Sequence, residues 1–424
     1  MKSIKLIILI FLLTFSFNSY SNGTLILGFP PKSANVRVGC LYPLSGRNKL
    51  YGLDSIEAIK LALKENNNTS LKISVIIENT KSKPYIAAKL ANYLIKKYKV
   101  NFLCGVVSSA VALTVTKIAK NEKIPFLGTD HSSSRLTIEE FHKYYFRVTN
   151  NTLQSMSAGA LFLKELKEKL KWKTIAFIGP DYEYGHRAWM DLKLALKSLN
   201  IKFKIVGEYW PKLFEPDYTL YIQNLLRNKP DILINAHWGQ DLVAFLRQAK
   251  NFGLLDKVIF CNFDTGGNYE VMASLQSELP SGLILGARHY NNWPQTKDNI
   301  NFVNSFFKQT NRYPSYVAHG AYAGIKVIFE VLKKVKHINN KEEIIKALEH
   351  LKIKLPKDPD NFTSFFNPKT HQIMQVIALG ETVPNFNYPP ATRMLGNWKI
   401  YYPTALEQII NSVRNKYLTQ NVNY

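Results

Sequence analysis

The chain has 424 residues, of which 46% are hydrophobic and 20% are charged, and this balance is typical of a globular protein rather than a disordered one. The formal net charge is +24, which would suit a polyanion-binding surface. However, the lysines are spread over most of the predicted helices and no zinc finger or RNP-like motif accompanies them, so we expect a solvated basic surface and no nucleic-acid partner.

The first 21 residues have the layout of a secretory signal peptide. Lys2 and Lys5 precede an apolar run at residues 6–17, and small residues follow, among them Ser19 and Ser21. The apolar run is about a dozen residues long, which is shorter than the roughly 20 that span a bilayer. We therefore expect cleavage after Ser21, a periplasmic location and no stable membrane insertion.

The chain then alternates strands and helices after an expected linker at residues 22–35. In the first round we expect strands at residues 36–44, 71–80, 101–106, 124–129 and 144–149, and helices at 51–66, 84–98 and 108–123. The apolar residues 56, 59, 62 and 63, for example, lie on one face of a helix. Three cysteines are too few for a dense disulfide framework. Cys40 and Cys104 could meet on neighbouring strands, but we expect them, like Cys261, to be buried free thiols.

A second round of the same rhythm follows. Here we expect helices at residues 153–170, 184–200, 216–229 and 239–254, and strands at 174–180, 202–210, 230–237 and 257–264. Strands that alternate with helices imply parallel sheets covered by helices, and roughly 400 residues are too many for one ordinary core. We therefore predict an α/β fold with two Rossmann-like, doubly wound lobes.

Polar residues gather where the predicted strands of the first round end, which is where open α/β sheets bind ligands. Ser108 and Ser109 follow a strand and begin a helix, whose first amides lack internal partners and attract an anion. The hydroxyl-rich stretch 130–134, which contains His131 and Ser132, follows the next strand. Either serine could instead cap its helix, and the stretch could be a plain surface turn.

The second round adds four candidates at its strand ends, which are Tyr184, His237, Trp238 and Asp264. Helix amides and hydroxyls on one wall suit a carboxylate, an acidic residue on the facing wall suits an ammonium group, and aromatic rings suit the side chain between them. Together these residues predict a site for a free amino acid. Taken singly, Asp264 could be a turn residue, Trp238 a packing residue and His237 a structural histidine.

Six stretches of the chain resemble the branched-chain amino acid-binding proteins of bacterial ABC importers, which have the class I periplasmic binding fold. They lie between residues 36 and 376 and read VGCLYPLSGRNKLYG, GVVSSAVALTVTKIAKNEKIPFLG, YFRVTNNTLQSMSAGALFL, IAFIGPDYEYG, PDILINAHWGQDLVAFLRQAKNFGL and FNPKTHQIMQV. The resemblance implies a Venus flytrap of two lobes joined by crossing hinge segments. The implied bounds are residues 36–148 plus 286–355 for lobe 1, 149–285 plus 356–400 for lobe 2, and 401–424 for a C-terminal tail.

The resemblance also implies ligand contacts. In that family the serine turn and the loop after the next strand hold the ligand carboxylate, and the matching residues here are Ser108, Ser109, His131 and Ser132. Tyr184 and Trp238 match the aromatic contacts, and Asp264 matches the acid that holds the ammonium group.

The chain departs from that family at several of these positions. His131 and His237 stand where small residues are common, Asp264 is shorter than the frequent glutamate, and Asn48 and Lys49 lie in a loop that often closes over the ligand. Plain leucine or isoleucine is therefore not the expected ligand.

We expect a monomeric, periplasmic substrate-binding protein that delivers a small amino acid or a related polar metabolite to the permease of an ABC importer, without a cofactor or a metal. A ligand-sensing receptor component for amides, urea or aromatic acids is the alternative. A cleft hydrolase built on His131, His237 and Asp264 is less favoured. No nucleophile is fixed beside these residues, and the chain has no HExxH, GxSxG or P-loop motif, so we expect no enzyme.

Overall fold

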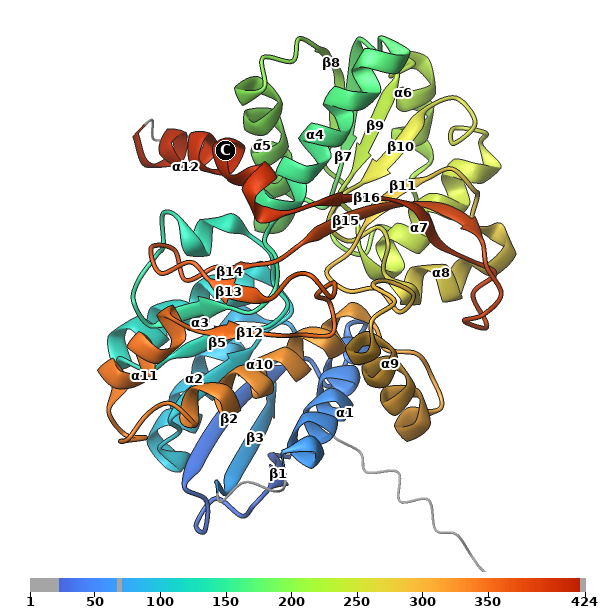
Figure 1. Cartoon of the computed structure of the whole chain (residues 1–424). Coiled ribbons are helices and arrows are strands. Elements are labelled where there is room, and N and C mark those ends of the chain that lie inside the picture. Colours follow the sequence, from blue (N-terminus) through green and yellow to red (C-terminus); the bar gives the residue numbers. More distant parts are fainter. Residues whose placement is uncertain (1–22, 67–70, 420–424) are drawn as a thin grey trace, which may run out of the picture.

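The computed structural model describes residues 23–66 and 71–419, and two large sheets organise them into two lobes (Figure 1). The predicted signal peptide, residues 1–21, lies outside the described residues. Among the described residues, no helix is both long and apolar enough to cross a membrane.

The first sheet has six strands in the order β1-β3-β2-β4-β5-β6, and every neighbouring pair is parallel except β1 with β3. Its strands are β1 (Leu25–Gly28), β2 (Val36–Tyr42), β3 (Ile73–Asn79), β4 (Phe102–Gly105), β5 (Phe126–Gly128) and β6 (Tyr145–Arg147). Successive side chains of a strand face opposite sides. Cys40 and Tyr42 therefore enter one core, and Leu41 enters the other.

Helices cover both faces of this sheet. The core that contains Cys40 includes residues of α1 (Lys49–Glu65), α9 (Lys297–Thr310), α10 (Tyr316–Leu332) and α11 (Lys341–Glu349). The core that contains Leu41 includes residues of α2 (Pro84–Tyr98) and α3 (Ser109–Glu122).

The second sheet has seven strands in the order β16-β15-β11-β10-β9-β7-β8. They are β7 (Thr174–Ile178), β8 (Lys204–Tyr209), β9 (Ile232–Asn235), β10 (Ile259–Asn262), β11 (Ile284–Gly286), β15 (Ile377–Pro384) and β16 (Arg393–Tyr401). The first five are parallel to one another, whereas β15 is antiparallel to both β11 and β16. Ile175 and Phe177 of β7 face one core, and Ala176 and Ile178 face the other.

Helices cover both faces of the second sheet as well. One core includes residues of α4 (Thr152–Leu170), α5 (Glu183–Ser198) and α12 (Pro403–Thr419), and the other includes residues of α6 (Thr219–Asn228), α7 (Gly239–Asn251) and α8 (Tyr269–Leu275). Both lobes are thus doubly wound, and the predicted fold class is confirmed.

A small third sheet lies where the chain passes between the lobes (Figure 1). It consists of β12 (Lys352–Ile353), β13 (Ser364–Phe366) and β14 (Ile373–Met374). The residue before β14, Gln372, also forms an isolated parallel bridge with Arg147 at the end of β6. The first part of the segment 356–400, which was expected to belong to lobe 2, therefore forms two strands of this separate sheet. The other lobe bounds stay a prediction.

The linker expected at residues 22–35 is wrong for its middle part, because Leu25–Gly28 form β1 and pair antiparallel with β3. The expected tail at residues 401–424 is also not a loose segment. Its first residue, Tyr401, ends β16, and the buried Leu406, Ile409 and Val413 of α12 join the core that contains α4 and α5.

The expectation of free thiols at Cys40 and Cys104 is wrong as well. The two residues are direct partners on the neighbouring parallel strands β2 and β4, with their Cα atoms 4.5 Å apart, and they form a disulfide that closes a separation of 64 residues. Residues paired in this way place their side chains on the same face of the sheet. Cys261 is buried and free.

We predict that the unreduced chain, unfolded in denaturant, exposes one reactive thiol and that reduction raises the number to three. A thiol-reactive chromophore measures this directly, and Cys261→Ala is the control that should show none before reduction. Cys104→Ser should lower the free energy of unfolding by about 2–5 kcal/mol, because the disulfide restricts the unfolded chain. Three reactive thiols before reduction would contradict the disulfide.

Candidate functional site

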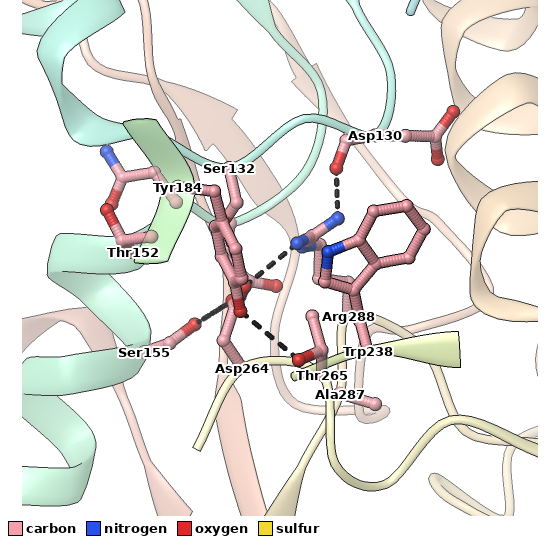
Figure 2. A network of polar contacts seen from close by, with 12 residues as sticks. Asp130, Ser132, Thr152, Ser155, Tyr184, Trp238, Asp264, Thr265, Ala287 and Arg288 are labelled. Atoms are coloured by element: carbon pink, nitrogen blue, oxygen red, sulfur yellow. Dashed lines mark hydrogen bonds and ion pairs between the residues drawn. The ribbon is translucent and has the colours of Figure 1, made fainter. Parts of the chain in front are cut away.

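The candidate site lies between the two sheets, and Figure 2 shows four of the predicted site residues there, namely Ser132, Tyr184, Trp238 and Asp264. Gly105 ends β4 with a φ of +112°, which side chains rarely allow, and a Cβ at this position would lie 2.5 Å from the carbonyl oxygen of Leu41. This glycine lets the chain turn sharply into Ser108 and Ser109, where α3 begins.

The serine turn positions the neighbouring loop instead of capping its own helix. The hydroxyl oxygen of Ser109 accepts from the backbone N–H of Ser132 at 3.4 Å and of Ser133 at 3.2 Å. Ser108 precedes α3 without a side-chain capping bond, and it is half-buried. Ser109 and Ser132 line a small cavity between the sheets, and Ser108 is not among its lining residues, so the ligand contacts of these serines stay a prediction.

Asp264, which follows β10, is completely buried and already has three donors (Figure 2). Its Oδ2 accepts from Nη2 of Arg288 at 2.8 Å and from the hydroxyl of Ser132 at 2.9 Å, and its Oδ1 accepts from the hydroxyl of Ser155 at 2.7 Å. Burial alone would raise the pKa of Asp264, but the ion pair with Arg288 and the hydroxyl donors outweigh it and hold the pKa below its usual range. The role of Asp264 as an ammonium partner stays a prediction.

Arg288, two residues after β11, was not predicted as a site residue. It is 3% exposed, it donates through Nη1 to the backbone carbonyl of Asp130 in the other lobe, and its guanidinium lies 4.9 Å from the ring centre of Tyr316. Burial would lower its pKa, but Asp264 raises the pKa above its usual value, so Arg288 is charged. Its Nε is buried and has no hydrogen-bond partner among the described residues.

A second guanidinium lies behind the loop that follows β5. Arg147 is completely buried and donates to the backbone carbonyls of Ser132 at 3.1 Å and Ser133 at 2.7 Å, but it has no carboxylate partner among the described residues. Burial raises the pKa of Asp130, in the same loop, to about 8, so this carboxyl is mostly neutral at pH 7. Two guanidinium groups thus lie beside the cleft, and Arg288 alone of the two has a carboxylate partner among the described residues.

Aromatic rings from both lobes enclose the cavity. Tyr184 and Trp238, both predicted, line it together with Tyr182, which follows the same predicted strand as Tyr184, and Tyr316, which was not predicted. The Tyr184 hydroxyl lies 3.2 Å from the hydroxyl of Thr265, and Nε1 of Trp238 donates to the hydroxyl of Tyr182 at 3.2 Å. The cavity has a volume of about 10 Å³, so the lobes have to separate before a ligand can enter.

The two predicted histidines lie in the cores beside the cleft. His131 uses both ring nitrogens, with the Val106 carbonyl at 3.0 Å and the Tyr145 hydroxyl at 2.6 Å, and burial holds its pKa well below the usual range. His237 packs against Phe245, and burial lowers its pKa to about 3. Neither lines the cavity, so a ligand contact of either stays a prediction that the geometry does not support.

The mouth of the cleft carries a buried carboxyl that joins the lobes. Tyr51 of α1 donates its hydroxyl to Glu270 of α8 at 3.0 Å, and the Tyr51 ring centre lies 5.6 Å from that of Trp238. Burial raises the pKa of Glu270 to about 7. In the described part of the chain, no group of three or more histidine, cysteine or acidic side chains is placed to hold a metal ion.

Solved structures share this fold. A solute-binding protein of an ABC transporter from Rhodopseudomonas palustris BisB5, in complex with 3,4-dihydroxybenzoic acid, superposes with a TM-score of 0.77 at 23% identity and covers 87% of this chain and 97% of its own. A leucine-binding protein from Thermotoga maritima MSB8 has a TM-score of 0.74 at 15% identity and covers 87% and 99%. The architecture is that of the class I periplasmic binding proteins.

The sequence comparisons give the family. A family model described as periplasmic binding protein matches residues 35–386, and the chain belongs to this family. A Leu/Ile/Val-binding protein homolog 4 from Brucella abortus (strain 2308) is 23% identical over 265 residues, which are 59% of this chain and 60% of that relative's length. The resemblance to the branched-chain amino acid-binding proteins is confirmed.

We predict that Asp264→Asn lowers the free energy of unfolding by about 3–5 kcal/mol at pH 7, because it leaves the Arg288 guanidinium buried without a counter-charge. Urea denaturation measures the loss. The double variant Asp264→Asn/Arg288→Met should recover most of it, since both charges are then absent. A single variant within about 1 kcal/mol of the parent chain would show that the buried ion pair does not form.

A second prediction concerns Glu270→Gln at the cleft mouth. Because the folded-state pKa of Glu270 is raised from 4.5 to about 7, this group stabilises the fold most below pH 4.5, and its contribution is lost as the pH rises through 7. The stability of the variant relative to the parent chain should therefore rise by roughly 2–3 kcal/mol between pH 4.5 and 8. Urea denaturation across this range tests it, with the exposed Glu168→Gln as the control. A flat difference would contradict the raised pKa.

Proposed function

We propose that this protein is the periplasmic substrate-binding component of an ABC importer, and that it captures a small organic ligand between its lobes and presents it to a membrane permease. Membership of the periplasmic binding protein family and the fold shared with substrate-binding proteins of ABC transporters support this role. A catalytic role has no geometric support, because both ring nitrogens of His131 are engaged in its own core and His237 lies outside the cavity.

We further propose that the ligand is a small aromatic carboxylic acid, and the observation that carries this is the Arg288–Asp264 ion pair. An ammonium group would compete with Arg288 for a carboxylate that already has three donors. Arg288, in contrast, has a buried Nε without an acceptor. A ligand carboxylate supplies that acceptor through a charge-assisted hydrogen bond.

The charges of the cleft favour the same ligand class. Arg147 and Arg288 are both cationic, Asp264 is ionised and Asp130 is mostly neutral, so these four groups leave one positive charge in excess. A monocarboxylate balances this charge and a zwitterion does not. Tyr182, Tyr184, Trp238 and Tyr316 offer ring faces and edges for a planar ligand.

A free amino acid is the second candidate, as the sequence predicts. The observation in its favour is that Ser109 and Ser132 line the cavity and that the Ser132 hydroxyl donates to Asp264 across the cleft, although Asp264 itself does not line the cavity. Proteins of this fold include examples of both ligand classes, since the Rhodopseudomonas protein holds an aromatic acid, 3,4-dihydroxybenzoic acid, and the Thermotoga protein is named for an amino acid, leucine.

Binding requires lobe opening and reclosure without any chemical step. In the closed form, Ser132 contacts Asp264 and Arg288 contacts Asp130, so protein atoms alone bridge the lobes. A ligand favours closure only through the contacts that it makes with both lobes. Ser109 and Ser132 on one side, and Arg288 with Tyr184 on the other, are placed to make them.

Paired ligands separate the two candidates. We predict that the parent chain binds 4-hydroxybenzoate at least tenfold more tightly than 4-hydroxybenzamide, and that Asp264→Asn/Arg288→Met abolishes the tight binding of 4-hydroxybenzoate in the cleft, because the charge-assisted bond to the carboxylate is lost there. Isothermal titration measures both affinities. The matched pair of leucine and 4-methylpentanoate, which lacks the ammonium group, is the control. Tight binding of leucine with no binding of 4-methylpentanoate would overturn the proposed ligand class.

The importer role has its own test. Co-purification of the mature chain with the membrane subunits of an ABC permease is the expected result. Co-purification with a regulatory protein instead would favour the ligand-sensing receptor that the same fold can serve. Mass spectrometry of small molecules carried through purification then identifies the natural ligand.

A further inference from the structure

A second cavity lies outside the cleft, and it is larger, with a volume of about 170 Å³. None of its lining residues lines the cleft cavity. Its walls come from the segment between β5 and β6, the first turn of α4, the strands β13 and β14, and α12. The family model ends at residue 386, so the whole of α12 lies outside the residues that it matches.

The sequence of α12 shows why the cavity has a polar wall. Leu406, Ile409, Val413 and Tyr417 form one buried stripe that packs into the core of the second lobe. A second stripe, offset around the helix at helical spacing, consists of Thr404, Glu407, Asn411 and Arg414, and all four line the cavity. One face of α12 thus fixes the helix, and the adjacent face is turned toward the cavity.

Two buried polar atoms at this cavity have no partner among the described residues. They are Nε of Arg414, which is a donor, and Oε1 of Gln372, which is an acceptor. Gln372 is 4% exposed, and its amide nitrogen is already used by the carbonyls of Thr149, at 2.6 Å, and Ile373, at 3.1 Å, so its oxygen alone is left open. Buried polar groups are normally satisfied, and unsatisfied ones call for an explanation.

The remaining walls mix polar side chains, such as Asn151, with the apolar side chains of Leu153, Phe365, Met374 and Ile410. The volume of about 170 Å³ is close to that of a cavity that holds benzene, so it suits a single ring with one or two substituents. A ligand that satisfies both atoms needs a hydrogen-bond acceptor for Nε of Arg414, preferably an anionic one, and a hydrogen-bond donor for Oε1 of Gln372.

We propose that this cavity is a second binding site, which takes a small organic carboxylate with an apolar body and a hydroxyl or N–H donor. The carboxylate contacts Arg414, the donor contacts Gln372, and the apolar body lies against Leu153 and Met374. The site is independent of the ligand assigned to the cleft, because it shares no residue with the cleft cavity.

The test uses the full mature chain and 4-hydroxybenzoate as the probe, since this molecule has a carboxylate, one ring and a hydroxyl donor. The cleft variant Asp264→Asn/Arg288→Met serves as the background, so that binding in the cleft does not contribute. Isothermal titration should still detect one binding event in this background, and adding Arg414→Met should weaken it at least tenfold. Adding Lys416→Met, which removes a cation of the same helix that does not line the cavity, should leave the affinity unchanged.

Two further probes report on the two polar atoms separately. Benzoate lacks the donor for Gln372 and phenol lacks the anion for Arg414, so both should bind the cleft variant more weakly than 4-hydroxybenzoate does. Absence of any binding of 4-hydroxybenzoate to the cleft variant would overturn the second site, and so would equal losses from Arg414→Met and Lys416→Met. Either result leaves the cleft proposal intact, because that proposal depends on the preference of the parent chain, whose cleft residues are in place, for 4-hydroxybenzoate over 4-hydroxybenzamide.

Discussion

The buried ion pair between Arg288 and Asp264 is the interaction on which the rest of the cleft depends. Removing two charges from water is costly, and a pair of this kind persists only where further hydrogen bonds satisfy both partners. The protein supplies these bonds from both lobes, through Ser155 and Ser132 to Asp264 and through the Asp130 carbonyl to Arg288. The same contacts that satisfy the pair therefore also hold the lobes together. Stability of the closed form and the chemistry of the site are consequently linked through one guanidinium.

The regular part of the fold up to β10 could be predicted from the sequence, because α1–α7 and β2–β10 follow clear hydrophobic patterns, and the ends of the predicted strands then locate the cleft. The short strand β1 and the elements after β10, including the long helices α10 and α12, were not predicted. Four residues of β1 have little room for a pattern, and three residues of β11 were not recognised, so the strand end that carries Arg288 was overlooked. The Cys40–Cys104 disulfide depends on the register of β2 with β4, which no local pattern encodes.

The site was predicted only in part, and His131 and His237 show why. Polar residues at strand ends look alike in a sequence, whether they face a ligand or serve a core. His131 bonds Tyr145, which lies on the next strand, whereas His237 bonds Asn235, two residues before it, through Nδ1 only, and its buried Nε2 has no partner among the described residues. Ser109 and Ser132 do line the cavity, but their partners are other residues of the protein. Only the packed structure separates these cases.

The ion pair also decides what a zwitterionic ligand would require. For its ammonium group to reach Asp264, the Arg288 side chain would have to leave its position, and its charge would then need another partner. The residues that line the cavity include no carboxylate, since Asp264 itself lies behind them, and burial raises the pKa of Asp130 in the facing loop to about 8. A carboxylic acid without an ammonium group avoids this rearrangement, because it adds an acceptor to a guanidinium that stays in place. The Arg288–Asp264 ion pair thus supports the proposed carboxylic acid over a free amino acid as the ligand.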